Sequence, residues 1–188
     1  LRIKDVDLSG GKLEVRGGKG DKDRVVSLPR SMLPALQEHQ NRVRAVFDAD
    51  RRNDVPGVHL PHAMAAKNPS AAQSWPWMWF FPSSRIWEDT ERDGSARRGE
   101  RAYGRGRHQL HEIAITRELE RAAKMAALSK RVTAHVLRHS FATHLVLKGI
   151  DIRSIKELLG HADVRTTEIY LQLAKAMRGE ITSPLDDL

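Results

Sequence analysis

Cysteine is absent from all 188 residues of the sequence, which excludes a disulfide framework and a zinc site built on thiolates. Long apolar runs are also missing. The longest, WPWMWFFP at 75–82, is far shorter than the about 20 residues that a helix needs to cross a bilayer. No secretory signal peptide is recognisable. We therefore expect a soluble, cytoplasmic protein without a membrane partner.

Acidic side chains are outnumbered by basic ones. The sequence has 24 Asp and Glu against 32 Lys and Arg, which gives a net charge of +8 at pH 7 and a pI of about 10.1. Such an excess favours a polyanionic partner, most often nucleic acid. The length suits one domain of ordinary size with a sizeable core.

Motifs for bound metals and cofactors are missing as well. The sequence has no P-loop, no dinucleotide-binding fingerprint and no paired carboxylates for two-metal nuclease chemistry. The segment HEIAI at 111–115 lacks the second histidine of a zinc-protease helix. His135 and His139 are four residues apart, but Arg138 shares their helical face and would repel a cation. We therefore expect no metal site and no cofactor.

The first half of the chain predicts a small sheet and one long helix. Residues 12–16 and 23–28 alternate apolar and polar side chains as strands do, and the glycine-rich GGKGDK between them suits a hairpin connection. Apolar residues at near-helical spacing predict a helix over 31–48. Residues 51–74 carry Pro, Gly, Asn and Ser with little periodicity, and they predict a long loop.

Two segments of unusual composition follow. Residues 75–81 hold three of the four tryptophans, and we interpret them as a buried strand or an anchored loop. An exposed platform on which bases stack is the alternative. Residues 93–109 carry five arginines on a glycine-rich frame. They form either a solvated loop or a loop that contacts phosphates.

The second half of the chain predicts four helices. The first covers 109–128. Its predicted buried stripe consists of Leu110, Ile113, Leu119, Ala122 and Ala126. The others run from Thr133 as N-cap to Gly149, from Asp151 as N-cap to Gly160, and from Thr166 or Thr167 as N-cap to about Met177. Helices after a small N-terminal antiparallel sheet indicate an α+β domain that is mainly helical.

The helix that begins after Thr133 carries three histidines and an arginine among apolar residues, in TAHVLRHSFATHL. At 100° per residue, Leu137 and Phe141 share one face, with His144 nearby. His135 and Arg138 lie about 60° apart on roughly the opposite side. The guanidinium offers a planar fork that matches two phosphate oxygens, and a neighbouring imidazole can donate to the same phosphate or carry a proton.

Two further polar residues follow. His161 comes directly after Gly160, on a turn from which its ring can project. Tyr170 is one of only two tyrosines, and its phenol attacks a phosphate only with help from adjacent cations or a base. Taken alone, Tyr170 is better explained as an amphipathic packing residue than as a nucleophile. His139 and His144 are expected to be structural.

The ordered set HVLRH, LLGH and TTEIY, which contains His135, Arg138, His161 and Tyr170 in that order, resembles the tyrosine site-specific recombinases. The segment GGKGDKDRVVSLP is similar to the β-hairpin that bears a catalytic lysine in that family, which implies this role for Lys19. The resemblance spans essentially the whole chain, and it implies the catalytic-domain fold of that family.

A narrower resemblance is to the integron integrases, which move gene cassettes. It rests on HLPHAMAAKNPSAAQSWPWMWFFPSSRI, on the basic stretch before RHQLHE and on the ending RGEITSPLDDL. It implies an inserted segment within 85–115 that helps to hold extrahelical bases of a folded single-stranded site. Three features depart from the family: His108-Gln109 replaces two adjacent histidines, Leu171-Gln172 replaces the usual Thr-His, and the loop rich in Arg and Gly is longer and lacks the usual Asp-Pro turn.

The resemblance implies phosphoryl transfer without a metal. Tyr170 attacks the scissile phosphate and forms a 3′-phosphotyrosyl bond, while Arg138, His135 and His161 hold the non-bridging oxygens and Lys19 protonates the leaving 5′-oxygen. The implied partners are folded single-stranded and double-stranded DNA, bound by a homotetramer in which Tyr170 acts in cis or in trans. The residues expected to contact DNA are Lys22, Arg24, Arg97, Arg98, Arg101, Arg105, Arg107 and His108.

The sequence starts without a methionine, and by motif spacing the family's first catalytic arginine falls before Leu1. We therefore expect residues 1–188 to be a C-terminal catalytic fragment that cleaves DNA poorly by itself. Three other functions stay open. They are a non-catalytic DNA-binding module of the same fold, a type IB topoisomerase, and a phage-type or chromosome-dimer-resolving recombinase without cassette specificity.

Overall fold

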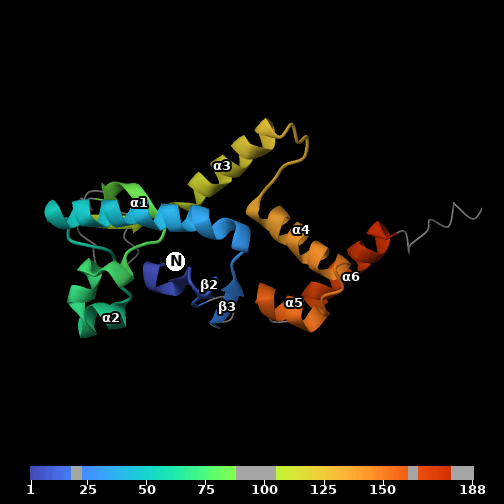
Figure 1. Cartoon of the computed structure of the whole chain (residues 1–188), viewed down its shortest axis with the longest axis horizontal. Coiled ribbons are helices and arrows are strands. Elements are labelled where there is room, and N and C mark those ends of the chain that lie inside the picture. The colour runs from blue at the N-terminus through green and yellow to red at the C-terminus, as the bar shows by residue number, and fades with distance from the viewer. Residues whose placement is uncertain (18–22, 88–104, 161–164, 179–188) are drawn as a thin grey trace, which may run out of the picture. The chain divides into compact units, whose positions relative to one another are not determined.

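The computed structural model describes residues 1–17, 23–87, 105–160 and 165–178 (Figure 1). Helices predominate, and the strands form two small antiparallel sheets, which confirms the predicted α+β, mainly helical class. The chain divides into two compact units. Unit 1 comprises Leu1–Glu14 and Ser27–His111, and unit 2 comprises Val15–Val26 and Glu112–Leu188. No helix within the described ranges is long and apolar enough to span a membrane.

The predicted N-terminal sheet is present. It has three strands, β1 (Val6–Asp7), β2 (Lys12–Val15) and β3 (Arg24–Ser27), in the order β1-β2-β3. Strand β1 pairs with β2 in antiparallel fashion, with Val6 opposite Leu13. Lys19 and Lys22, between β2 and β3, lie outside the described residues.

Unit 1 is built around α1 (Leu33–Arg52), which follows a short 3-10 turn at Arg30–Met32. This confirms the predicted helix over 31–48 and extends it by one turn. Val43 and Phe47 of α1 are buried in the core of the unit, together with Ile3, Val58, Met78 and Phe80. Asp50, one turn after Phe47, is buried as well.

The prediction of a loop over 51–74 is wrong. The segment contains the helix α2 (His62–Lys67) and the 3-10 helix η3 (Pro69–Gln73). Pro61 is the N-cap of α2, and Pro69 is the first residue of η3. A proline at the start of a helix costs no hydrogen bond and has a suitable φ, so these prolines begin helices here.

The tryptophan-rich segment is an anchored loop, as predicted. Trp75–Trp77 form the 3-10 helix η4. Met78 and Phe80 after it are buried in the core. Two backbone hydrogen bonds tie the segment to the start of the chain, from the Ile3 amide to the Met78 carbonyl (2.9 Å) and from the Phe80 amide to the Leu1 carbonyl (3.1 Å).

The second sheet of unit 1 has two antiparallel strands, β4 (Pro82–Trp87) and β5 (Gly106–Gln109). They flank residues 88–104, which lie outside the described ranges and include Arg97, Arg98 and Arg101. Most of the arginine-rich segment predicted to contact DNA is therefore not part of the described structure.

Unit 2 contains the four predicted helices, α3 (Glu112–Met125), α4 (Ala134–Leu147), α5 (Ile152–Leu159) and α6 (Arg165–Met177). The Thr133 hydroxyl accepts a hydrogen bond from the Val136 amide, and the Asp151 carboxylate caps α5 as predicted. Helix α6 begins at Arg165, so the prediction of a threonine N-cap is wrong.

The buried faces of α3 and α4 differ from those predicted. No described residue of α3 is buried, and Leu110 and Ile113 of the expected stripe are exposed. On α4 the buried residues are Ala142, Thr143 and Val146, whereas Leu137 and Phe141 are about half exposed. His144 is exposed too, which contradicts its predicted core-facing position. The small side chains lie inside because α4 packs closely against α5 and α6.

Candidate active site

Arg138 of α4 lies at the C-terminus of α5. Helices α4, α5 and α6 pack against one another as a three-helix group (Figure 1). Nη2 of Arg138 donates a hydrogen bond of 2.5 Å to the Leu159 carbonyl, at the last residue of α5. The last carbonyls of a helix lack intrahelical partners and carry partial negative charge, so they attract a guanidinium. This bond uses one N–H of the fork and fixes the position of Arg138 at the turn before His161.

Three aromatic rings lead from α4 to α6. The ring centroids of His135 and His139 are 4.6 Å apart in an edge-to-face arrangement. His139 in turn lies 5.4 Å from the Tyr170 ring. His139 was expected to be structural, but it is the residue that contacts both the predicted phosphate ligand His135 and the predicted nucleophile Tyr170.

Tyr170 itself is only 2% exposed. It belongs to the core cluster of unit 2 with Ala142, Val146, Ile155, Leu159 and Ala174. The structure therefore brings the predicted nucleophile next to His139 of α4, but it places Tyr170 within the core, where a DNA phosphate does not reach it.

Arg24 of β3 lies at the same turn as Arg138. Gly160 has a φ of +66°, and a Cβ atom built on it would lie 2.6 Å from Nη1 of Arg24. The Arg24 guanidinium is thus packed against the backbone of Gly160, while Arg138 binds the carbonyl of the preceding residue. Two guanidinium groups therefore flank the Leu159–Gly160 turn, and they make this part of unit 2 strongly basic.

Several predicted site residues lie outside the described ranges. His161 and Lys19 of the predicted catalytic set are among them, as are Lys22, Arg97, Arg98 and Arg101 of the DNA-contact set. Among the residues that are described, no group of three or more His, Cys, Asp or Glu is arranged to hold a metal ion.

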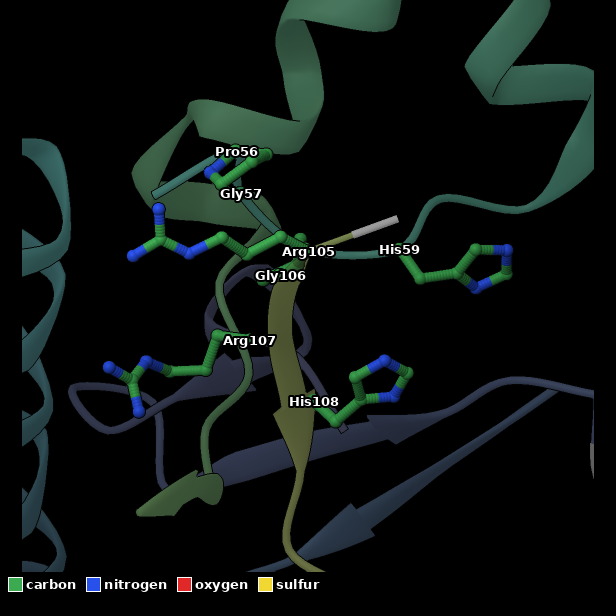
Figure 2. Close-up of a pocket in the computed structure, with 8 residues that line it drawn as sticks. Pro56, Gly57, His59, Arg105, Gly106, Arg107 and His108 are labelled. Carbon is green, nitrogen blue, oxygen red and sulfur yellow. The ribbon is translucent and has the colours of Figure 1, made fainter. Parts of the chain in front are cut away.

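The remaining predicted DNA contacts lie in unit 1, around a pocket of about 250 Å³. Its lining comes from Pro56, Gly57, Val58 and His59 on one segment and from Arg105, Gly106, Arg107 and His108 on the other. Figure 2 shows the side chains of His59 and His108 on one side of β5 and those of Arg105 and Arg107 on the other. His59 and His108 both line the pocket, and both residues are half buried.

Arg107 does not have the exposure that a DNA contact requires. It forms a buried ion pair with Asp50 of α1, with side chains 9% and 7% exposed. Its guanidinium also donates to the carbonyls of Ser83 and Ser84. We correct the prediction for this residue: Arg107 is a structural cation, because its hydrogen-bonding groups are bound within the protein.

Asp50 and His139 were not among the predicted site residues. Asp50 follows the buried position Phe47 by three residues and therefore falls on the inner face of α1, which was the only signal in the sequence. His139 follows Arg138 directly, and its contact with Tyr170 depends on the packing of α4 against α6.

A model of the phage integrase family matches residues 1–177. An integrase/recombinase of Escherichia coli is 42% identical over 188 residues, which are 100% of this chain and 53% of that protein. Tyrosine recombinase XerA of Pyrococcus furiosus is 31% identical over 173 residues, which are 92% of this chain and 43% of that protein. The chain spans about half the length of the curated relatives it matches.

Solved structures agree with these sequence matches. The crystal structure of XerA recombinase superimposes with a TM-score of 0.59 at 28% identity, over 95% of this chain and 50% of that one. A post-cleavage complex of XerH site-specific recombinase with its palindromic difH substrate gives a TM-score of 0.54 at 26% identity, over 96% of this chain and 38% of that one. The fold is therefore that of a tyrosine recombinase catalytic domain. The family match covers nearly all of the sequence, and the chain belongs to the phage integrase family.

Proposed function

We propose that this chain is the catalytic domain of a site-specific DNA recombinase that breaks and rejoins strands through Tyr170. The observation that carries the proposal is the grouping of Tyr170, His135 and Arg138 on two packed helices of unit 2 in a member of this family. Relatives with this fold include one solved with its DNA substrate.

In the proposed reaction, the Tyr170 phenolate forms a bond to the scissile phosphorus, and the bond from phosphorus to the 5′-oxygen breaks. The leaving 5′-oxygen takes a proton from Lys19, and the phosphate remains on the enzyme as a 3′-phosphotyrosyl ester. Arg138, His135 and His161 bind the non-bridging oxygens, where negative charge increases in the transition state. Attack by the 5′-hydroxyl of another strand reverses these steps and yields the recombinant.

The burial of Tyr170 adds a condition to this mechanism. Because the residue is 2% exposed, α6 must shift away from α4 before the phenol meets a phosphate. Such a shift places the nucleophile either in its own site or in that of a neighbouring copy in a DNA-bound homotetramer.

A nicked half-site oligonucleotide tests the proposal, because loss of the short strand after cleavage traps the covalent adduct. We expect a DNA–protein adduct that survives denaturation, and none with Tyr170→Phe. Arg138→Ala should reduce the rate of adduct formation by a factor of about 10²–10³, which is the usual effect of removing one hydrogen-bond donor to the developing oxyanion. The assay should use this chain and any longer form that its gene encodes. An adduct with Tyr170→Phe, or none with any form of the protein, contradicts the proposal.

We further propose that the DNA is a folded single strand of the integron type, with an extrahelical base in the pocket beside His59 and His108 (Figure 2). The pocket volume of about 250 Å³ accommodates one planar base, and two half-buried imidazoles offer stacking surfaces and hydrogen-bond donors. Binding of a hairpin with one extruded base should therefore be tighter than binding of the same hairpin without it. Equal affinities would favour a recombinase that acts on ordinary duplex sites.

A non-catalytic DNA-binding module is the second candidate, and the burial of Tyr170 favours it. Such a module would bind DNA with a strong dependence on salt and would give no adduct with nicked half-sites. The adduct assay therefore separates the two functions.

A further inference from the structure

Strands β4 and β5 are paired through an irregular ladder. Pro82 is opposite Gln109 and Ile86 is opposite Arg107, so four steps along β4 correspond to two along β5. A bulge of this kind leaves backbone groups of the longer strand without partners in the ladder. A slip of the pairing by one residue would turn every side chain of β5 to the opposite face.

The side chain of Arg107 occupies the interrupted part of the ladder. Its Nη1 donates to the carbonyl of Ser83 at 2.8 Å and to that of Ser84 at 3.4 Å, and both carbonyls belong to the bulged stretch of β4. Its Nε and Nη2 donate to the two carboxylate oxygens of Asp50, each at 2.5 Å. One planar group thus connects β4, β5 and α1.

The backbone of Arg107 is held as firmly. Its amide donates to the Gly57 carbonyl at 2.9 Å, and its carbonyl accepts a hydrogen bond from the Trp79 indole at 3.1 Å. His108 is the next residue along the strand, so its side chain points to the opposite face, the one that also carries His59 (Figure 2). The orientation of His108 therefore depends on the anchoring of Arg107.

We propose that Asp50 and Arg107 are a positioning pair that sets the register of β5 and thereby directs His108 into the base-binding pocket. The DNA part of this inference rests on the proposed recognition of an extrahelical base. Stability alone does not require the pair, because apolar side chains of similar volume often replace a buried ion pair without loss. Only a planar fork of donors reaches a carboxylate and two carbonyls at once.

Arg107→Lys tests the pair while it keeps the positive charge, since an ammonium cannot form this set of bonds. Affinity is measured by fluorescence anisotropy for two hairpin DNAs that differ only in one extruded base. We expect the preference for the extruded base to fall about tenfold, which corresponds to about 1.4 kcal/mol. Affinity for the hairpin without that base should fall less, so the ratio of the two affinities reports the preference.

A double substitution separates an effect on the position of His108 from an effect on the stability of the protein. Asp50→Leu with Arg107→Met restores an uncharged, packed pair, so its unfolding midpoint should exceed that of Arg107→Lys, yet the preference should still be lost. If the double variant keeps the preference, the positioning role is wrong. Arg44→Lys and Asp48→Asn are the matched controls, because this exposed ion pair on α1 has the same residue types, and neither should affect the preference.

Disulfide formation between β4 and β5 tests the register of these strands without DNA. Because the chain has no cysteine, P82C/Q109C introduces a single pair at opposed positions at one end of the bulge. Disulfide formation should be fast in this background and several times slower when Arg107→Lys is added. An unchanged rate overturns the positioning role whatever the DNA result. A wild-type chain that binds DNA without preferring the extruded base overturns instead the proposed ligand of the pocket and the DNA part of the inference.

Discussion

Gly160 shows at the residue scale why the turn after α5 requires glycine. Its φ of +66° lies in the left-handed region, and Arg24 occupies the space where a Cβ would be. Two neighbours therefore depend on this residue, namely the Arg24 guanidinium and the Leu159 carbonyl that accepts from Arg138. The absence of a side chain here serves the packing of a cation as well as the geometry of the helix end.

We predict that Gly160→Ala destabilises the chain more than Gly149→Ala does. Gly149 has a φ of +78° with nothing within 4 Å of an added Cβ, so alanine there costs only backbone strain, about 1–2 kcal/mol. Gly160→Ala adds the displacement of Arg24 to the same strain. Urea unfolding followed by far-UV circular dichroism measures both. Equal losses would show that Arg24 moves aside freely.

Asp151 gives a prediction for pH. The pKa of its carboxyl is lowered from the ordinary 3.8, first by the hydrogen bond from the Ser154 hydroxyl and then by that from the Ser154 amide. Because the folded pKa is the lower one, the cap stabilises α5 fully above the unfolded value and this contribution is lost as the pH falls through the folded pKa. Ser154→Ala should raise the Asp151 pKa in an NMR titration, whereas Asp151→Asn should weaken the pH dependence of unfolding below pH 3.8. An unchanged Asp151 pKa in Ser154→Ala would assign the shift to the backbone bonds.

At the scale of whole elements, the limits of sequence patterns are clearest on α4. The helix, its N-cap Thr133 and the Asp151 cap of the next helix were all predicted, because capping and periodicity are local properties. The buried face was not. Periodicity identified Leu137 and Phe141, but Ala142 and Val146 are buried, since close packing of α4 on α6 selects small residues. Which face of α4 is buried therefore depends on the helix that packs against it, and the hydrophobic pattern of α4 alone does not show this.

This packing makes Ala174 of α6 sensitive to size. The residue is 1% exposed within the cluster that contains Tyr170 and Ala142. We predict that Ala174→Leu overpacks the contact, destabilises the chain by about 1–3 kcal/mol and moves α6 outward. Ala176→Leu is the matched control on an exposed position of the same helix and should be nearly neutral. Urea denaturation compares them, and equal stabilities would mean that α4 and α6 are loosely packed.

At the scale of the whole molecule, the candidate site combines residues from distant parts of the chain. Tyr170, His135 and Arg138 were predicted because their order and spacing resemble a family pattern. Asp50 and Arg107 show what such a pattern omits. They are 57 positions apart, and nothing in the glycine-rich basic stretch distinguishes Arg107 by sequence from Arg105, which is exposed. Only the fold shows that Arg107 has a buried carboxylate as its partner.

This distinction matters for how the net charge of +8 would contribute to the proposed binding of DNA. A plot of the logarithm of the DNA-binding constant against the logarithm of the salt concentration has a slope set by the number of phosphates that the protein contacts. The loss of one phosphate contact reduces the magnitude of this slope by about 1. Arg105 is exposed at the edge of the pocket, so Arg105→Ala should lower the slope. Arg42→Ala removes the same charge from an exposed position of α1 that is paired with Glu38, so it should weaken affinity slightly and leave the slope unchanged. Filter binding across a salt series measures both slopes. If both variants reduce the slope equally, the attraction comes from overall charge, and Arg105 contacts no phosphate.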